Sequence, residues 1–296
     1  MARLKRAISG WLILDKPYGM TSTQAVGKVR WLYGAEKAGH AGTLDPLAKG
    51  LLPIALGEAT KTVPFVQDGG KRYSFDLEWG SSTTTDDAEG DVIATSDHRP
   101  TKADVLAALP AFTGTIMQRP PIFSAIKIDG ERAYDLARAG EPVELAPRPV
   151  TIDELTLVAH DETRSRFAMA CEKGTYARSL ARDLAEALGT RGHVTMLRRT
   201  AVAGFTEADA VQLDTIEAAP DRDVLLRPAS VALRHIPELL VSADDAALIR
   251  NGSPVLLRGA GAPVAVAEAW ASFNGAAVAI GSVRLGQFHP NRVLKG

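Results

Sequence analysis

The sequence predicts an α+β protein, in which a mixed, largely antiparallel sheet with flanking helices precedes a small C-terminal β-barrel. Strand-like and helix-like segments alternate irregularly, and several strands follow one another directly, which argues against a regular doubly wound fold. The end of the chain consists of short segments rich in valine and alanine, separated by glycine turns. That pattern is typical of a small barrel attached to a larger domain.

The first elements are a short strand at 11–14, a helix, a buried strand and a second, shorter helix. Thr21 or Ser22 is the expected N-cap of the first helix, which extends to about Tyr33. A glycine-rich loop then leads into the apolar run LLPIAL, which predicts the buried strand, and residues 58–67 form the short helix.

The segment KRYSFDLEWG, residues 71–80, alternates in polarity as a half-buried strand does. Its apolar face carries Tyr73, Phe75, Leu77 and Trp79. Further strands are predicted in the runs PVTIDELTLVAH, RFAMACEKG and HVTMLRRTAVAGF.

Helices are predicted near 102–109, 131–139 and 175–188, the last because apolar residues recur every four positions. The texture of the chain changes around 228–240, where two prolines bracket a linker. We therefore predict two domains, a larger one of residues 1–234 and a smaller one of residues 235–296.

The composition indicates a cytoplasmic globular protein. Of its 296 residues, 46% are hydrophobic and 23% are charged, and the formal net charge is −1, so a polyanionic partner needs a local basic patch. The single cysteine excludes an internal disulfide framework and suits a reducing compartment. The apolar run WLIL is too short for a signal peptide, and charged or polar residues interrupt the weakly polar stretch at 262–281, so we expect no membrane span.

The sequence predicts neither a cofactor nor a metal. It contains no G-x-x-x-x-G-K-[ST] and no G-x-G-x-x-G motif. The six histidines are never spaced by two to four residues, and a lone cysteine cannot build the usual zinc site. The acidic run DDAEGD at 86–91 lacks the order of ligands of an EF-hand and is interpreted as a solvated loop.

Asp45 is the strongest candidate for chemistry carried out by a side chain alone. It lies in the loop GHAGTLDPLAKGLLP, and a free aspartate with a pKa of about 3.9 is ionised at neutral pH. Pro46 restrains the residue before it, which would aim the carboxylate. An equally good interpretation is that Asp45 caps a helical turn that begins at Pro46.

A second candidate site is the start of the helix in KGTYARSLARDLAEAL. Arg178 lies close to a glycine turn, and an arginine fork is a natural partner for a carboxylate. For Arg182 we expect a solvated face and a weak pair with Glu186. The local excess of cations between 173 and 200 is consistent with a track for a phosphate backbone.

These residues resemble a known family. The stretch GHAGTLDPLAKGLLPIALGEATK is similar to the catalytic motif of the TruB-type tRNA pseudouridine synthases, whose usual form is GHTGTLDPLATGLLP. LDKPYGMTS, KRYSFDLEWG, PPIFSAIKIDGERAYDLARAG, GTYARSLARDLAEALG and HVTMLRRTAVAGF resemble further motifs of the family, in the family's order. The tail resembles the PUA-like RNA-binding domain that many members carry. Ala41, Lys49 and Ala177 depart from the family's usual residues.

The resemblance implies a catalytic role for Asp45 and a cofactor-free isomerisation. The family converts one uridine in the T arm of tRNA, position 55, to pseudouridine on a base flipped out of its stack. Arg178 would pair with Asp45 and orient it.

The resemblance also implies which residues contact the substrate. Tyr73 would stack on the target base, while Tyr176 and Leu197 would line the base pocket. His40 would reach into the T loop, and Lys16, with its neighbouring proline, would shape the floor of the site.

Two alternatives stay open at this point. Glycoside hydrolysis also uses carboxylates at an anomeric carbon but needs a second one, for which Asp15, Asp86 or Asp87 are candidates without a supporting motif. The other is a non-catalytic protein that binds tRNA or assists its folding. The expected partner is the tRNA T stem-loop, without membrane or metal, and the expected state is a monomer.

Overall fold

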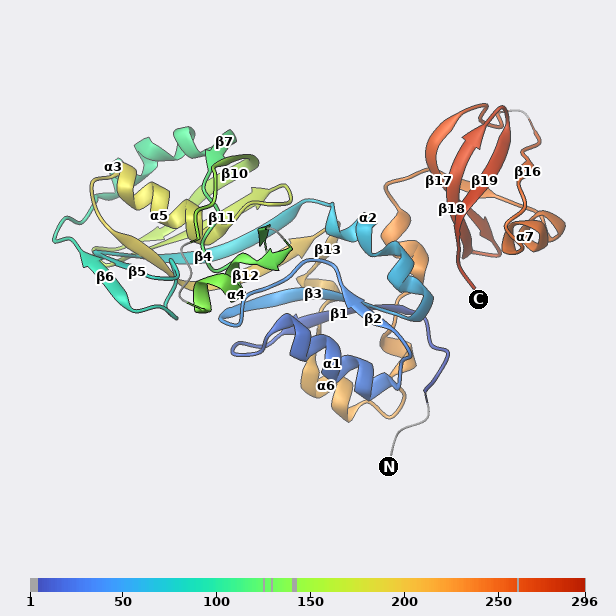
Figure 1. Cartoon of the computed structure of the whole chain (residues 1–296), viewed down its shortest axis with the longest axis horizontal. Helices are drawn as coiled ribbons and strands as arrows, with labels where there is room; N and C mark the ends of the chain where they lie inside the picture. The colour runs from blue at the N-terminus through green and yellow to red at the C-terminus, as the bar shows by residue number, and fades with distance from the viewer. Residues whose placement is uncertain (1–4, 125, 129, 140–142, 260, 296) are drawn as a thin grey trace.

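The computed structural model describes residues 5–124, 126–128, 130–139, 143–259 and 261–295. Within them the strands form a ten-stranded sheet, a five-stranded C-terminal sheet and two two-stranded sheets (Figure 1). The prediction of an α+β protein with a small C-terminal β-unit is confirmed.

The large sheet is mixed and largely antiparallel, as predicted. Its main path runs β14-β1-β3-β12-β4-β11-β10-β7, with β2 paired to β3 and β13 paired to β12. Among these pairs, β1 with β14 and β3 with β12 are parallel, and the others are antiparallel. The strands are β1 (Gly10–Lys16), β2 (Ala38–His40), β3 (Ala48–Leu56), β4 (Lys71–Trp79), β7 (Gly114–Gln118), β10 (Arg148–His160), β11 (Arg164–Cys171), β12 (Gly192–Val202), β13 (Phe205–Thr206) and β14 (Val211–Gln212).

Helices α1 to α6 belong to the part of the chain that contains this sheet, and α7 lies among the strands of the C-terminal sheet in the sequence. They are α1 (Ser22–Tyr33), α2 (Val63–Gln67), α3 (Lys102–Ala108), α4 (Ala133–Arg138), α5 (Ala177–Ala187), α6 (Leu213–Ala218) and α7 (Ala243–Arg250). Short 3-10 turns are η1 (Gly57–Thr62), η2 (Leu109–Phe112), η3 (Glu207–Asp209), η4 (Asp223–Leu225) and η5 (Ala229–Leu233). Two small hairpins, β5 (Ser81–Thr83) with β6 (Val92–Thr95) and β8 (Lys127–Ile128) with β9 (Glu131–Arg132), were not expected from the sequence.

Helix α1 begins where the sequence predicts. Thr21 is its N-cap, and the Thr21 hydroxyl accepts a hydrogen bond from the Gln24 N–H while the Gln24 side chain accepts one from the Thr21 N–H. This capping box satisfies two backbone donors that the first turn otherwise leaves free. Gly34 ends the helix in the left-handed conformation, with φ of +62°.

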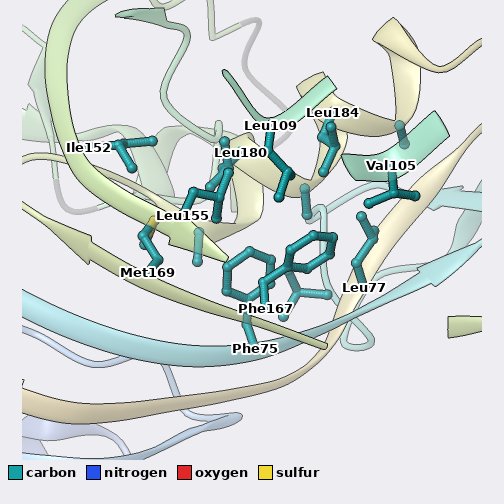
Figure 2. Close-up of a cluster of buried hydrophobic side chains, with 14 of the residues drawn as sticks. Phe75, Leu77, Val105, Leu109, Ile152, Leu155, Phe167, Met169, Leu180 and Leu184 are labelled. Atoms are coloured by element: carbon teal, nitrogen blue, oxygen red, sulfur yellow. The ribbon is translucent and has the colours of Figure 1, made fainter. Parts of the chain in front are cut away.

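The alternating face of β4 is buried as predicted. Phe75, Leu77 and Trp79 pack with Phe167 of β11 in a hydrophobic cluster beneath α3 and α5 (Figure 2). The rings of Phe75 and Phe167 stack at 5.2 Å between centroids. Tyr73 lies at the edge of this cluster and also packs against a second one, formed by α1, α6, β1 and β3.

The C-terminal sheet is a curled half-barrel rather than a closed barrel, with the strand order β15-β17-β18-β19-β16. Its strands are β15 (Glu238–Leu240), β16 (Val255–Leu256), β17 (Val266–Phe273), β18 (Ala276–Arg284) and β19 (Gln287–Val293). The short helix α2 lies between the two sheets (Figure 1). Its Phe65 packs with Leu233, Trp270 and Leu294.

Among the described residues, no helix has both the length and the apolar character needed to span a bilayer.

Candidate active site

The loop that carries Asp45 is fixed from both sides by backbone contacts. Ser22 of α1 brackets Leu44, since its hydroxyl donates to the Leu44 carbonyl and accepts from the Leu44 N–H, both at 2.9 Å. On the other side, the Pro46 carbonyl accepts a hydrogen bond from the Gly19 N–H at 2.9 Å. The residues on either side of Asp45 therefore hold it in place.

Asp45 does not cap a helix. Pro46 and Leu47 form a turn that leads directly into β3, closed by the Ala48 N–H donating to the Asp45 carbonyl at 3.1 Å. The Asp45 carboxylate instead forms an ion pair with Arg178, with Oδ2 and Nη2 2.9 Å apart. The capping interpretation is thus wrong, and the carboxylate pairs with a cation of α5.

Arg178 is held in a buried position in the first turn of α5. Its side chain is 5% exposed, and it donates hydrogen bonds to the carbonyls of Thr85 and Phe123, each at 3.0 Å. Its Nε lies 3.6 Å from a second carboxylate, that of Asp87. Because these contacts restrain the guanidinium, it presents Nη2 to Asp45 in a defined direction.

The helix start that positions Arg178 is itself fixed. Gly174 has a φ of +90°, which permits the turn between β11 and α5. The backbone N–H and carbonyl of Tyr176 both hydrogen bond to the Gln118 side-chain amide, at 2.9 and 3.1 Å. Arg148 lies over the Tyr176 ring, 5.5 Å from its centroid.

A cavity of about 260 Å³ opens beside this ion pair. Asp45, Tyr73, Tyr176, Arg178 and Leu197 all line it, together with residues of α2 and of the turn before α5. The lining therefore combines one half-exposed carboxylate, two aromatic rings, aliphatic side chains and several cations. A planar polar ring fits such a set, because aromatic and aliphatic groups cover its faces while polar groups contact its edge.

A buried cation lies beneath the loop that carries Asp45. Lys16 is fully buried and donates to the carbonyls of Pro17, Met20 and Pro46, at 3.0, 2.6 and 3.3 Å. Burial lowers the pKa of Lys16 to about 8, although the charge of Asp45 opposes this shift. Burial raises the pKa of Tyr73, so its hydroxyl is protonated at neutral pH.

Two family models match the chain. One, the N-terminal domain of the TruB family of pseudouridylate synthases, covers residues 30–177. The other, the C-terminal domain of tRNA pseudouridylate synthase B, covers residues 178–234. The chain belongs to the TruB family of pseudouridylate synthases.

Relatives that match this chain over almost their whole length support the same family assignment. The tRNA pseudouridine synthase B of Brucella anthropi is 52% identical over 97% of this chain and 96% of its own length. Those of Rhizobium johnstonii and Mesorhizobium japonicum are 54% and 51% identical, over 97% and 98% of this chain and 96% and 97% of their own lengths. As a TruB-family member the chain is a pseudouridine synthase, an isomerase.

The fold extends to more distant solved structures. A chain in an H/ACA RNP bound to a substrate RNA that contains 2′-deoxyuridine superposes with a TM-score of 0.74 at 22% identity, covering 97% of this chain and 85% of that one. A chain of a Cbf5–Nop10–Gar1 complex gives a TM-score of 0.72 at 23% identity, with the same coverage.

Of the seven site residues predicted from the sequence, five line the cavity described above and two, Lys16 and His40, do not. Lys16 lies beneath the loop, under Pro46, rather than on the cavity wall. His40 lies on β2, half-buried, and its Nδ1 has no hydrogen-bond partner among the described residues. Burial and the charge of Arg199 lower the pKa of His40, so the ring is neutral at pH 7.

The expectation for Arg182 is wrong. Its guanidinium pairs with Asp86 and Asp183, both at 2.9 Å, and its side chain is 20% exposed. Glu186, the partner expected for it, pairs with Arg191 instead.

The acidic run at 86–91 is not simply a solvated loop either. Asp87 is buried and approaches Arg178, while Asp86 pairs with the next arginine of α5. Within the described residues, no group of three or more histidine, cysteine or acidic side chains is arranged to hold a metal.

The cations between 173 and 200 do not form a row of unpaired charges. Lys173 pairs with Asp68, and Arg198 pairs with Asp15 and Glu207. The arginines of α5 and Arg191 have the acidic partners given above, and Arg199 donates to backbone carbonyls. These cations therefore have partners within the protein, and their contact with a phosphate backbone stays a prediction.

The sequence does not identify three residues of this site. It offers Asp87 only as a second carboxylate for hydrolysis, it does not single out Lys71, and it presents Arg199 only as one of the cations between 173 and 200. Lys71 and Arg199 line the cavity, and Asp87 lies against Arg178. Lys71 and Arg199 lie in the runs KRY and LRR, but each run contains two cations, and the sequence does not show which of the two is buried.

Proposed function

We propose that this chain isomerises the uridine at position 55 in the T arm of tRNA to pseudouridine, and that Asp45 is its catalytic residue. The observation that carries the proposal is the Asp45–Arg178 ion pair at the wall of a cavity that also contains Tyr73. A carboxylate that is 37% exposed and held by a buried arginine is available to a substrate and fixed in direction.

The reaction breaks the bond between N1 of the base and C1′ of the ribose, and the base rotates. A bond between C5 and C1′ then forms, C5 loses a proton and N1 gains one, so the reaction consumes nothing. Asp45 reacts with or stabilises the electron-poor intermediate while the base turns, and Arg178 holds the carboxylate in place.

The base must leave its stack before this chemistry, at a cost of a few kcal/mol. Tyr73 replaces the lost stacking on one side of the uracil, and Tyr176 with Leu197 encloses the rest of the ring. All three line the cavity, which supports these roles. His40 contacts the T loop to hold the nucleotide flipped out, and Lys16 supports the floor beneath Asp45.

The partner is the T stem-loop of tRNA, recognised by shape, stacking and phosphate contacts. Residues 1–234 form the catalytic domain, and residues 235–296 form a PUA-like domain that adds RNA contacts. The enzyme acts as a monomer in the cytoplasm and uses neither metal nor cofactor.

The ion pair supports catalysis over tRNA binding or folding without chemistry, because binding alone does not require a half-exposed carboxylate directed by a buried cation.

The test uses an unmodified tRNA transcript tritiated at uridine C5. Isomerisation by the wild-type enzyme releases tritium, whereas Asp45→Asn loses turnover by about 1,000-fold or more but binds the transcript as before. Free uracil would indicate hydrolysis, binding without release would indicate a folding protein, and retained turnover in Asp45→Asn would remove Asp45 from the mechanism. A transcript with the T-loop uridine replaced by cytidine tests the position.

A further inference from the structure

Arg199 is a fully buried cation whose hydrogen bonds go to backbone carbonyls. It is 1% exposed on β12, between β3 and β4, where it pairs in register with Gly50 and Tyr73. Nε donates to the Leu51 carbonyl at 2.7 Å, Nη2 to that of Gly42 at 3.0 Å and Nη1 weakly to that of Thr43 at 3.5 Å. Within the described residues no carboxylate forms an ion pair with it, so its burial is costly.

The carbonyls that Arg199 binds lie on both sides of Asp45 in the chain. Gly42 and Thr43 precede Asp45, and Leu51 follows it in β3. One rigid planar group therefore joins the backbone before Asp45 to the strand after it.

The glycines of the loop fit around this residue. Gly42 has a φ of +97°, and a Cβ there would lie 3.3 Å from Nη1 of Arg199. Gly50 has a φ of +102°, and a Cβ there would collide with the Arg199 backbone. Both glycines thus have a backbone conformation that disfavours a side chain, and a Cβ at either position would press on Arg199.

Arg199 also lies beside Tyr73, its register partner on the adjacent strand β4. The charge of Arg199 opposes the rise that burial causes in the pKa of the Tyr73 hydroxyl. Both residues line the cavity that Asp45 borders. Arg199 therefore contacts the loop that carries the carboxylate and is the cross-strand neighbour of Tyr73.

We propose that Arg199 is a positioning residue for the isomerisation, which sets the location of Asp45 relative to the Tyr73 ring through the carbonyls of Gly42, Thr43 and Leu51. This inference rests on the proposed function. A displacement of about 1 Å at a reacting group can cost about 100-fold in rate, so the effect of losing Arg199 is expected in turnover rather than in affinity.

The experiment compares Arg199→Lys and Arg199→Met with wild type and with the control Arg72→Lys. Arg72 lies next to Tyr73 on β4 but is exposed, in an ion pair with Glu154. Single-turnover tritium release is measured at saturating tRNA and normalised to the folded fraction. The tRNA dissociation constant is measured in an Asp45→Asn background, and melting temperature is recorded for each variant.

Arg199→Lys is expected to lower the single-turnover rate by about 10- to 100-fold, and Arg199→Met by more, with dissociation constants within about threefold of wild type. Arg72→Lys is expected to match wild type. An unchanged rate per folded enzyme, even with a lower melting temperature, would overturn the proposal, as would a loss that lies entirely in tRNA affinity. If Arg199→Met does not fold, Arg199→Lys decides the question.

A measurement that does not depend on activity tests the positioning role of Arg199 separately from the proposed isomerisation. Hydrogen exchange of the amides at 42–48 is expected to accelerate in Arg199→Lys, while exchange in α5 stays as in wild type. A wild-type enzyme that releases no tritium would overturn the proposed function, and unchanged exchange in the loop would still overturn the positioning role on its own.

Discussion

The Asp45 carboxylate and the Arg178 guanidinium meet at 2.9 Å, but they differ sharply in exposure: the Asp45 side chain is 37% exposed and that of Arg178 is 5% exposed. The cation is therefore a fixed part of the interior, and the carboxylate is the part that a substrate can reach. Asp87 is buried and approaches the Nε atom of the same guanidinium at 3.6 Å, so it also balances the charge of Arg178.

Replacing Arg178 is expected to impair turnover far more than binding. Arg178→Lys keeps a charge but loses the fork that contacts Asp45 and two carbonyls, so turnover should fall with little change in tRNA affinity. Arg178→Ala also leaves the buried Asp87 unpaired, at a cost of about 3–5 kcal/mol in the free energy of unfolding. Single-turnover rates, filter binding and urea denaturation measure the three quantities.

The control is Arg191→Ala, which breaks an exposed pair with Glu186 and should cost about 1 kcal/mol or less. If Arg178→Lys lost affinity in proportion to turnover, the residue would be a phosphate contact instead.

Gly50→Ala is expected to be much more destabilising than Gly189→Ala. Both glycines have positive φ, which costs an alanine roughly 1–2 kcal/mol. A Cβ at Gly189 meets nothing within 4 Å, whereas one at Gly50 would collide with the Arg199 backbone. Chemical denaturation of the two variants should show the difference, and equal losses would mean that β3 and β12 can separate at this point.

The stability of the protein is expected to depend on Lys16 between about pH 8 and pH 10.5. The pKa of Lys16 is lowered by burial from 10.5 to about 8, so in this window the unfolded chain binds a proton that the folded chain does not. Stability linked to Lys16 therefore rises with pH, by at most about 1.4 kcal/mol per pH unit. Below pH 8 both states are protonated and the full burial penalty applies.

Urea denaturation of wild type and Lys16→Met at pH 7.5 and 9.5 tests this expectation. The gain in the free energy of unfolding between the two pH values should be larger for wild type. An identical gain in both proteins would mean that Lys16 stays protonated in the folded state.

Removal of residues 235–296 is expected to weaken tRNA binding and lower stability while the chemistry persists. The deletion exposes Phe65 and Leu233, which pack against Trp270, and each loses about 1.5–3 kcal/mol of burial. Single-turnover release at high enzyme concentration should remain measurable below the melting temperature. A truncated protein that is folded and binds tRNA but is inactive would place an essential group in the C-terminal sheet.

Much of the fold was predictable because its signals are local. The period-2 alternation at Tyr73 identifies a strand with one buried face, and a threonine before an amphipathic run identifies the start of α1. The glycines around Asp45 predicted an irregular loop, and the resemblance of this loop to a family motif favoured a catalytic role for Asp45 over a capping role.

What the sequence does not reveal depends on pairing between distant strands. Arg198 and Arg199 are adjacent, but successive side chains of a strand point to opposite faces, so one meets Asp15 near the surface and the other is buried. Which of them is buried follows only from the place of β12 between β3 and β4. Asp86 likewise has a positive φ of 60°, and the sequence pattern does not predict this backbone conformation.

The Asp45 loop owes its shape to groups that lie elsewhere in the chain: a hydroxyl from α1, an ammonium from β1 and a guanidinium from β12, each contacting loop backbone. A transplanted copy of residues 39–53 would therefore not reproduce this geometry on a foreign scaffold. An engineer who wished to move the active site would have to move Ser22, Lys16 and Arg199 with it, and hence most of the central sheet.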